Sequence, residues 1–219
     1  MVSSARRIGF RSWLSASLLV LLMSTGAAPA DSIPAGKLAV LKFDPAKTTI
    51  KYSISGWPHS PEGTFQLKSG LIRVDPATGR MDGLIVVDAA SGNSGNSLRD
   101  ARMRDSVLEA RRFPDITFAP EQAQSHGGTQ GEFPVTVRGV MSLHGGQHPF
   151  TIDARVRREG NAVLINCSFS IPYVAWGLEN PSILMFRVSK HVDINVTATA
   201  ALSWASPAPD AAHADSHSP

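Results

Sequence analysis

The sequence predicts an all-β fold in which many antiparallel strands form a barrel or a sandwich, with one short helix between two strands. Two observations lead to this prediction. Apolar and polar residues alternate with a period of two in a series of stretches, and short segments rich in Gly, Pro, Asn or Asp separate these stretches. Strands that follow one another through short turns are typical of a meander that closes on itself.

Because successive side chains of a strand point to opposite faces, the apolar members of each stretch are predicted to face the interior. Large members alternate with the small Gly139, Ala154 and Cys167, which either contact a large neighbour or leave space. The sequence therefore leaves open whether the interior is packed or hollow. The rows are Ile50, Tyr52 and Ile54; Phe65 and Leu67; Ile72 and Val74; Val135, Val137, Gly139, Met141 and Leu143; Phe150, Ile152, Ala154 and Val156; Val163, Ile165, Cys167, Phe169 and Ile171; Val192, Ile194, Val196, Ala198 and Ala200.

The segment 97–110 lacks Gly, Pro and alternation, and this predicts the helix. Ser97 is the predicted N-cap, and Asp100 in the first turn complements the helix dipole. Met103 and Val107 are four residues apart on one helix face, with Leu108 beside them. We expect these apolar residues to seat the helix against one end of the barrel.

Residues 1–30 have the three parts of a secretory signal peptide in order: Arg6, Arg7 and Arg11, an apolar run over 13–23, and an Ala-Pro-Ala box at 28–30. The apolar run is about half the roughly 20 residues that a helix needs to cross a bilayer. We expect cleavage after Ala30 and a periplasmic or secreted protein, with an uncleaved anchor as the alternative. Residues 31–40 are predicted to be a linker and 205–219 a disordered tail, because they lack periodicity.

The predicted signal peptide carries the whole net charge of +3. The chain has 21 Lys and Arg and 18 Asp and Glu, and residues 1–30 contain three Arg and no acid, so 18 of each sign remain. Nucleic acids and anionic membrane surfaces bind basic proteins. A neutral mature chain therefore argues against either of them as the partner.

No motif for catalysis or metal binding stands out in the sequence. There is no G-x-S-x-G, P-loop or G-x-G-x-x-G motif, and the histidines lack metal-site spacing, so we expect them at turns or on the surface. Cys167 lies in an apolar row and is predicted to be a core side chain, and as the single cysteine it leaves no internal disulfide. We therefore predict no catalytic residue, no metal ligand and no cofactor.

Several longer motifs follow one another in the order of a known family. They are F-D-P-A-K-T-T-I at 43–50, G-T-F followed by G-L-I-R-V-D-P within 63–76, D-A-A-S through R-D-A-R-M-R within 88–104, R-F-P-D-I-T-F at 112–118, and V-R-G-V-M-S-L-H-G followed by H-P-F within 137–150. Together they make residues 41–199 resemble the YceI-like family of secreted, lipocalin-like, polyisoprenoid-binding proteins. Residues 57–61 and 171–178 depart from the family pattern, so the chain resembles a divergent member.

The resemblance implies an eight-stranded antiparallel lipocalin-like barrel over residues 41–204, with one short helix between strands. It also implies non-catalytic binding, storage or transport of a polyisoprenoid or similar amphiphilic lipid in an apolar barrel cavity in the periplasm, together with a homodimer and transient contact with membranes. Each methylene removed from water contributes about 0.8 kcal/mol, which explains why a carrier would enclose such a chain. The alternatives are a packed interaction barrel that assists an envelope-stress or membrane electron-transfer system, and an enzyme that uses the cavity as a reaction chamber.

The candidate ligand-binding residues fall into three groups. Trp57 and Trp176 lie in irregular segments, where they would rim the mouth of the barrel or plug its end. Arg99 would bind a diphosphate head group through its planar guanidinium, or form a structural pair with Asp100. The predicted cavity wall consists of Tyr52, Phe65, Leu67, Val137, Met141 and Phe169.

Overall fold

A computed structural model describes residues 36–127, 131–182 and 187–206. The predicted signal peptide, residues 31–35 of the predicted linker and residues 207–219 of the tail lie outside the described residues. None of the helices in the described ranges is long and apolar enough to cross a membrane.

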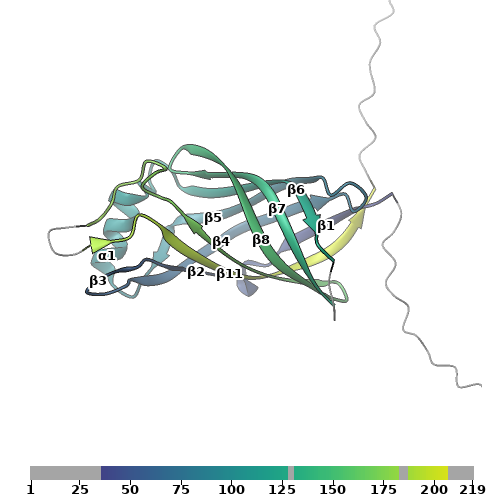
Figure 1. The fold of residues 1–219 in the computed structure, drawn as a ribbon, viewed down its shortest axis with the longest axis horizontal. Coiled ribbons are helices and arrows are strands. Elements are labelled where there is room, and N and C mark those ends of the chain that lie inside the picture. Colours follow the sequence, from purple (N-terminus) through teal and green to yellow (C-terminus); the bar gives the residue numbers. More distant parts are fainter. Residues whose placement is uncertain (1–35, 128–130, 183–186, 207–219) are drawn as a thin grey trace, which may run out of the picture. The chain divides into compact units, whose positions relative to one another are not determined.

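The described chain is built almost entirely from antiparallel strands (Figure 1). Two short helical segments interrupt them, the 3₁₀ turn η1 and the pair formed by α1 and η2. The elements in chain order are β1 (Leu38–Phe43), η1 (Pro45–Lys47), β2 (Thr49–Ser53), β3 (Gly56–Trp57), β4 (Glu62–Val74), β5 (Met81–Asn93), α1 (Ser97–Arg102), η2 (Met103–Val107), β6 (Asp115–Ser125), β7 (Glu132–Leu143), β8 (Gly146–Glu159), β9 (Ala162–Ile171), β10 (Arg187–Val188) and β11 (Val192–Ala205).

The long strand β11 closes the barrel. One of its edges pairs with β9, and its other edge pairs first with β2 and then with β1. β4 also pairs with both β1 and β2, so these two strands, separated by η1, share a single position in the wall. The result is a closed antiparallel barrel of eight strand positions, which confirms the predicted fold.

A bulge in β4 explains a change of phase in the sequence. Phe65 and Leu67 face inward at odd positions, whereas Ile72 and Val74 face inward at even positions. The register between β4 and β5 shifts between Leu67 and Ser69. One extra residue on a strand moves every later side chain to the other face, so both rows reach the interior.

The first strand begins earlier than the sequence predicts. Residues 38–40, which the sequence assigns to the linker, belong to β1 and pair with β11. The last strand ends at Ala205, one residue beyond the predicted end of the domain. The alternation in residues 38–43 is weak, and only pairing with β11 and β4 identifies them as a strand.

The predicted helix forms, but its start and its winding differ from the expectation. The cap is Asn96 rather than Ser97, because the Asn96 side chain accepts a hydrogen bond from the Arg99 backbone N–H. The α-helical part ends at Arg102 and continues as the π-helical turn η2. Met103, Val107 and Leu108 pack into the core cluster, as the spacing predicted.

Candidate functional site

The barrel is hollow. A cavity of about 1280 Å³ runs inside it from the turn at 75–79 to α1 and the segment that follows β9. Its wall consists of the inward rows of the strands, and side chains such as Ile50, Ile152 and Ile194 line it. A cavity of this size exceeds the roughly 300–1,000 Å³ of ordinary small-molecule sites. The question that the sequence left open, packed or hollow, is answered in favour of a cavity.

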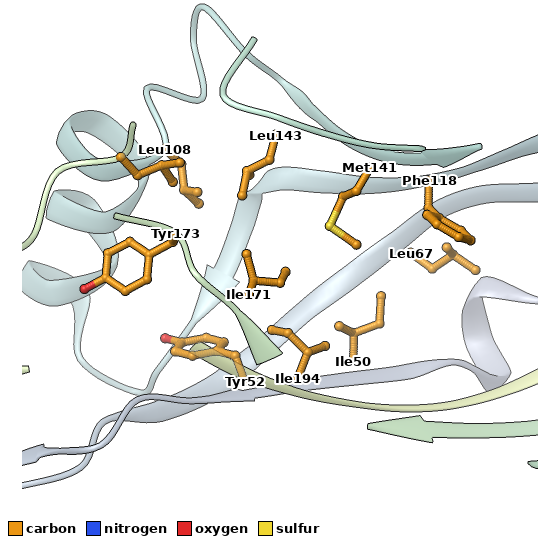
Figure 2. Close-up of a cluster of buried hydrophobic side chains, with 11 residues drawn as sticks. Ile50, Tyr52, Leu67, Leu108, Phe118, Met141, Leu143, Ile171, Tyr173 and Ile194 are labelled. Carbon is orange, nitrogen blue, oxygen red and sulfur yellow. The ribbon is translucent and has the colours of Figure 1, made fainter. Parts of the chain in front are cut away.

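All six predicted wall residues line the cavity. Tyr52, Leu67 and Met141 are also among its most buried members, at 4 to 5% exposure. Figure 2 shows how side chains from several strands and from the helical segment converge on the interior. The residues of the predicted set that line the cavity are Tyr52, Phe65, Leu67, Arg99, Val137, Met141 and Phe169.

A polar cluster lies at the end of the cavity near α1. The Arg99 guanidinium donates from Nε to the Ser94 hydroxyl over 2.8 Å and from Nη2 to the Ser94 carbonyl over 3.1 Å. Asp100 accepts hydrogen bonds from the Ser94 backbone N–H, at 2.9 Å, and from its hydroxyl. Arg99 and Asp100 therefore act together through Ser94, which differs from the predicted direct pair.

Tyr52 joins this cluster from β2, which is separated from β5 by the single strand β4. Burial raises the pKa of the Tyr52 phenol, while a hydrogen bond to Ser94 opposes that rise. The ring also contacts Phe65, with centroids 5.3 Å apart. Tyr52 thus presents an apolar ring to the cavity and its hydroxyl to the polar end.

Two cavity-lining residues at this end, Tyr173 and Arg102, were not singled out by sequence reasoning. Tyr173 is 4% exposed and donates its hydroxyl proton to the Ser189 carbonyl over 2.8 Å. Burial raises the pKa of Tyr173 as well. Arg102 also lines the cavity, and its Nη2 lies 3.7 Å from the Glu179 carboxylate. The departure of residues 171–178 from the family pattern was the available signal for Tyr173.

The opposite end of the cavity is lined by a different set of groups. Asp75 and Thr78, from the β4–β5 turn, and Gln122, from β6, lie there with Arg158 of β8. Asp75 accepts hydrogen bonds from the Ala77 N–H and the Thr78 hydroxyl, which lowers its pKa. These hydrogen bonds close the turn on itself, so Asp75 is already occupied by structural partners.

Cys167 faces the cavity from β9. Burial raises the pKa of its thiol to about 11, so the thiol is neutral at physiological pH. A neutral thiol is a poor nucleophile. The environment agrees with the prediction of a core side chain rather than a reactive group.

Neither predicted tryptophan lines the cavity. Trp57 in β3 is 67% exposed. Trp176 is half-buried and stacks on His148, with centroids 4.0 Å apart and ring planes 2° apart. It also meets the edge of Phe150, which in turn contacts the cavity-lining Phe169 at 5.4 Å. Trp176, His148 and Phe150 thus form an aromatic cluster, here called the aromatic plug, that does not line the cavity.

This aromatic plug covers a seam in the wall. β8 and β9 pair only between Ala154–Glu159 and Ala162–Cys167, although both strands continue toward the α1 end. Phe150 and Phe169 lie on the parts of β8 and β9 that do not pair with each other. Side-chain packing thus replaces the missing backbone ladder at this point.

Two of the histidines are less exposed than a surface position would make them. His144 is at the β7–β8 turn, as expected, but its side chain is only 18% exposed and lies 3.3 Å from the Glu109 carboxylate. His148 is half-buried against Trp176. Within the described ranges, no three His, Cys, Asp or Glu side chains are grouped as metal ligands.

The fold is shared with solved structures. BcnA of Burkholderia cenocepacia superposes with a TM-score of 0.59 at 18% identity, covering 72% of this chain and 98% of that one. A polyisoprenoid-binding domain from Saccharophagus degradans, implicated in plant cell wall breakdown, gives a TM-score of 0.58 at 17% identity, covering 74% and 98%. At these identities the likeness shows the architecture alone.

Sequence comparison identifies the family. UPF0312 proteins of Vibrio parahaemolyticus and Vibrio campbellii are each 30% identical over 148 residues, which covers 64% of this chain and 75% of each relative. The pattern of the YceI-like domain matches residues 41–200, which include nearly all of the barrel. The chain belongs to the YceI-like family.

Proposed function

We propose that this protein binds a polyisoprenoid or similar long amphiphilic lipid inside the barrel, and that it stores or carries this lipid in the periplasm without catalysis. The observation that carries the proposal is the cavity of about 1280 Å³, which is lined by apolar side chains along the barrel and has its charged groups near the ends. Burial of methyl and methylene groups along such a wall would supply the binding free energy.

The α1 end is the proposed site of the polar head group. Arg99 is held by two hydrogen bonds to Ser94, which leaves three of its five N–H donors for a ligand. A guanidinium that is already oriented loses little conformational entropy when it binds phosphate oxygens. Arg102 adds a second cation on the same rim.

Three further considerations support the remaining parts of this proposal. The buried Cys167 has a raised pKa and is suited to packing rather than to catalysis. The S. degradans domain with the same fold is described as polyisoprenoid-binding. The predicted signal peptide would deliver the protein to an aqueous compartment beside membranes, where an insoluble prenyl chain needs a carrier.

Lipid extraction from protein purified from its native host tests the proposal directly. Mass spectrometry is expected to detect a stoichiometric prenyl lipid that is absent after denaturation and refolding in detergent. Loading of the refolded protein with a prenyl alcohol and with the diphosphate of the same chain then measures affinity. Failure to retain either compound would contradict the proposal.

The head-group assignment has its own test. Arg99→Ala is expected to weaken binding of the prenyl diphosphate about tenfold, roughly 1.4 kcal/mol, while affinity for the alcohol stays within twofold or so. Arg104→Ala is the matched control, because Arg104 pairs with Asp105 and does not line the cavity. Equal losses for both ligands would remove Arg99 from the head-group role.

A further inference from the structure

We propose that the α1 end of the barrel docks on anionic phospholipid bilayers by inserting Leu98 and Trp57, so that the mouth of the cavity faces the membrane. This inference rests on the proposed lipid-binding function and adds the surface through which the lipid is exchanged. The neutral charge of the mature chain argued against an anionic membrane as partner. The local arrangement of charge at this mouth points the other way.

Leu98 and Trp57 are the most exposed large apolar side chains of the described residues. Leu98 is 83% exposed and Trp57 is 67% exposed, whereas Leu71, Leu84 and Phe133 are 41 to 42% exposed. A leucine exposed to this degree buries almost none of its side chain within the barrel. The fold alone therefore gives no reason for an apolar side chain at residue 98.

Both side chains stand at the same end of the barrel. Leu98 is in the first turn of α1 and lines the cavity mouth. Trp57 is in β3, within the connection between Ile54 and Pro61, two residues that also line the cavity. Figure 1 shows β3 and α1 together at one end of the barrel. A surface that accepts Leu98 and Trp57 would thus meet the opening itself.

The charged groups at this mouth favour an anionic surface. The charged residues that line it, within the described part of the chain, are Arg99 and Arg102, of which Arg102 is paired with Glu179, whereas the opposite end has Asp75 and Arg158. Arg187, paired in register with Trp57, adds a further exposed cation. Lys and Arg side chains are attracted to an anionic leaflet, and Trp is favoured at the level of the headgroups.

A second copy of the chain fits this surface less well than a bilayer does. In a two-fold interface the same patch meets itself, so Arg99, Arg102 and Arg187 would be brought close to their own counterparts. Like charges placed opposite one another oppose association. An anionic bilayer instead has an apolar interior that can bury Leu98 and Trp57, and negatively charged headgroups that attract the arginines.

Co-sedimentation of the full mature protein with vesicles tests the docking surface. The wild type is expected to bind vesicles of phosphatidylethanolamine and phosphatidylglycerol, and to bind phosphatidylcholine vesicles less. Leu98→Glu is expected to lower the partition coefficient at least about tenfold, because burial of a leucine contributes about 1.5–3 kcal/mol. Leu84→Glu is the matched control, since Leu84 is exposed on β5 and does not line the cavity.

A second experiment separates docking from lipid binding. Trp57→Ser leaves the cavity wall intact, so loading of prenyl alcohol from detergent is expected to match the wild type, while transfer from vesicles slows several-fold. Equal vesicle binding by the wild type, Leu98→Glu and Trp57→Ser would overturn the docking proposal. So would a concentration-dependent dimer, in analytical ultracentrifugation, that both substitutions abolish. Loss of loading from detergent in the wild type would instead overturn the proposed function.

Discussion

The indole of Trp176 and the imidazole of His148 lie parallel, with centroids 4.0 Å apart and planes 2° apart. Trp176 belongs to the turn after β9, and His148 to the start of β8. Their contact bridges the two strands where the β8–β9 ladder is absent. The wall of the barrel is therefore completed by aromatic side chains at a place where backbone hydrogen bonds do not complete it.

Removing this plug is expected to destabilise the barrel. Trp176→Ala should lower the free energy of unfolding by about 3 kcal/mol, the lower end of the range for such truncations, because Trp176 is half-buried. Urea denaturation measures the change. Trp57→Ala is the control, and its effect should stay within about 0.5 kcal/mol because Trp57 is 67% exposed. Similar losses for the two tryptophans would contradict the assignment of Trp176 as the plug.

Filling the cavity is expected to shorten the ligand that it accepts. Ala198 is 3% exposed and lines the cavity, so Ala198→Phe places a ring in the space proposed for the lipid. Affinity for a long prenyl alcohol should fall about tenfold, which corresponds to roughly two buried methylenes, while a shorter alcohol is less affected. Isothermal titration in detergent compares the two ligands.

Ala201→Phe is the control on the same strand, because Ala201 is exposed and does not line the cavity. It should leave both affinities unchanged. If Ala198→Phe weakened the short and the long ligand equally, the substitution would be acting on the fold and not on the length of the cavity.

The protonation of the Cys167 thiol reports whether the interior of the barrel excludes water. Burial raises the pKa of its thiol from 9.0 to about 11, so alkylation of the native protein by iodoacetamide should reach half its limiting rate near pH 11. In urea the midpoint should return to about 9. A bound prenyl lipid should slow alkylation of the native protein further. The Cys167→Ala variant, which has no thiol, is the negative control. A native midpoint near 9 would mean that the thiol is open to water.

The same shift predicts a pH dependence of stability. The unfolded thiol releases its proton near pH 9.0, whereas the native thiol keeps it up to about pH 11. The unfolded state therefore binds fewer protons in this window, and the free energy of unfolding decreases as the pH rises from 9.0 to about 11. Because Tyr52 and Tyr173 also have raised pKa values, the contribution of Cys167 is the difference between wild type and Cys167→Ala.

The helix cap is expected to support the polar cluster. Asn96→Ala removes the acceptor for the Arg99 N–H and should cost about 1 kcal/mol of unfolding free energy. Ser97→Ala changes a residue that the sequence identified as the cap, but which lies inside α1, where Ala is well tolerated. Thermal unfolding of the two variants should therefore separate them. A larger loss for Ser97→Ala would restore the cap predicted from the sequence.

On its own, the sequence predicts most of the long strands and the side of each of these strands that faces inward. Tyr52, Leu67, Met141 and Phe169 line the cavity as their period-2 rows predicted, because the face of a strand residue is a local property. The helix after β5 and the seating of Met103 and Leu108 were also readable, since the spacing of a helix face is equally local.

How these elements enclose space depends on contacts across the whole barrel. Whether facing rows touch or leave a cavity depends on the number, tilt and stagger of all the strands, which no single stretch of sequence encodes. For the same reason Trp176 became the plug of a seam and Trp57 was left on the surface, although both lie in similar irregular segments. The loop before α1 places Ser94 where it contacts both Arg99 and Asp100. Tyr52 contacts Ser94 from another strand. Contacts between residues far apart in the chain are set by closure of the barrel, and closure is a property of the whole sheet.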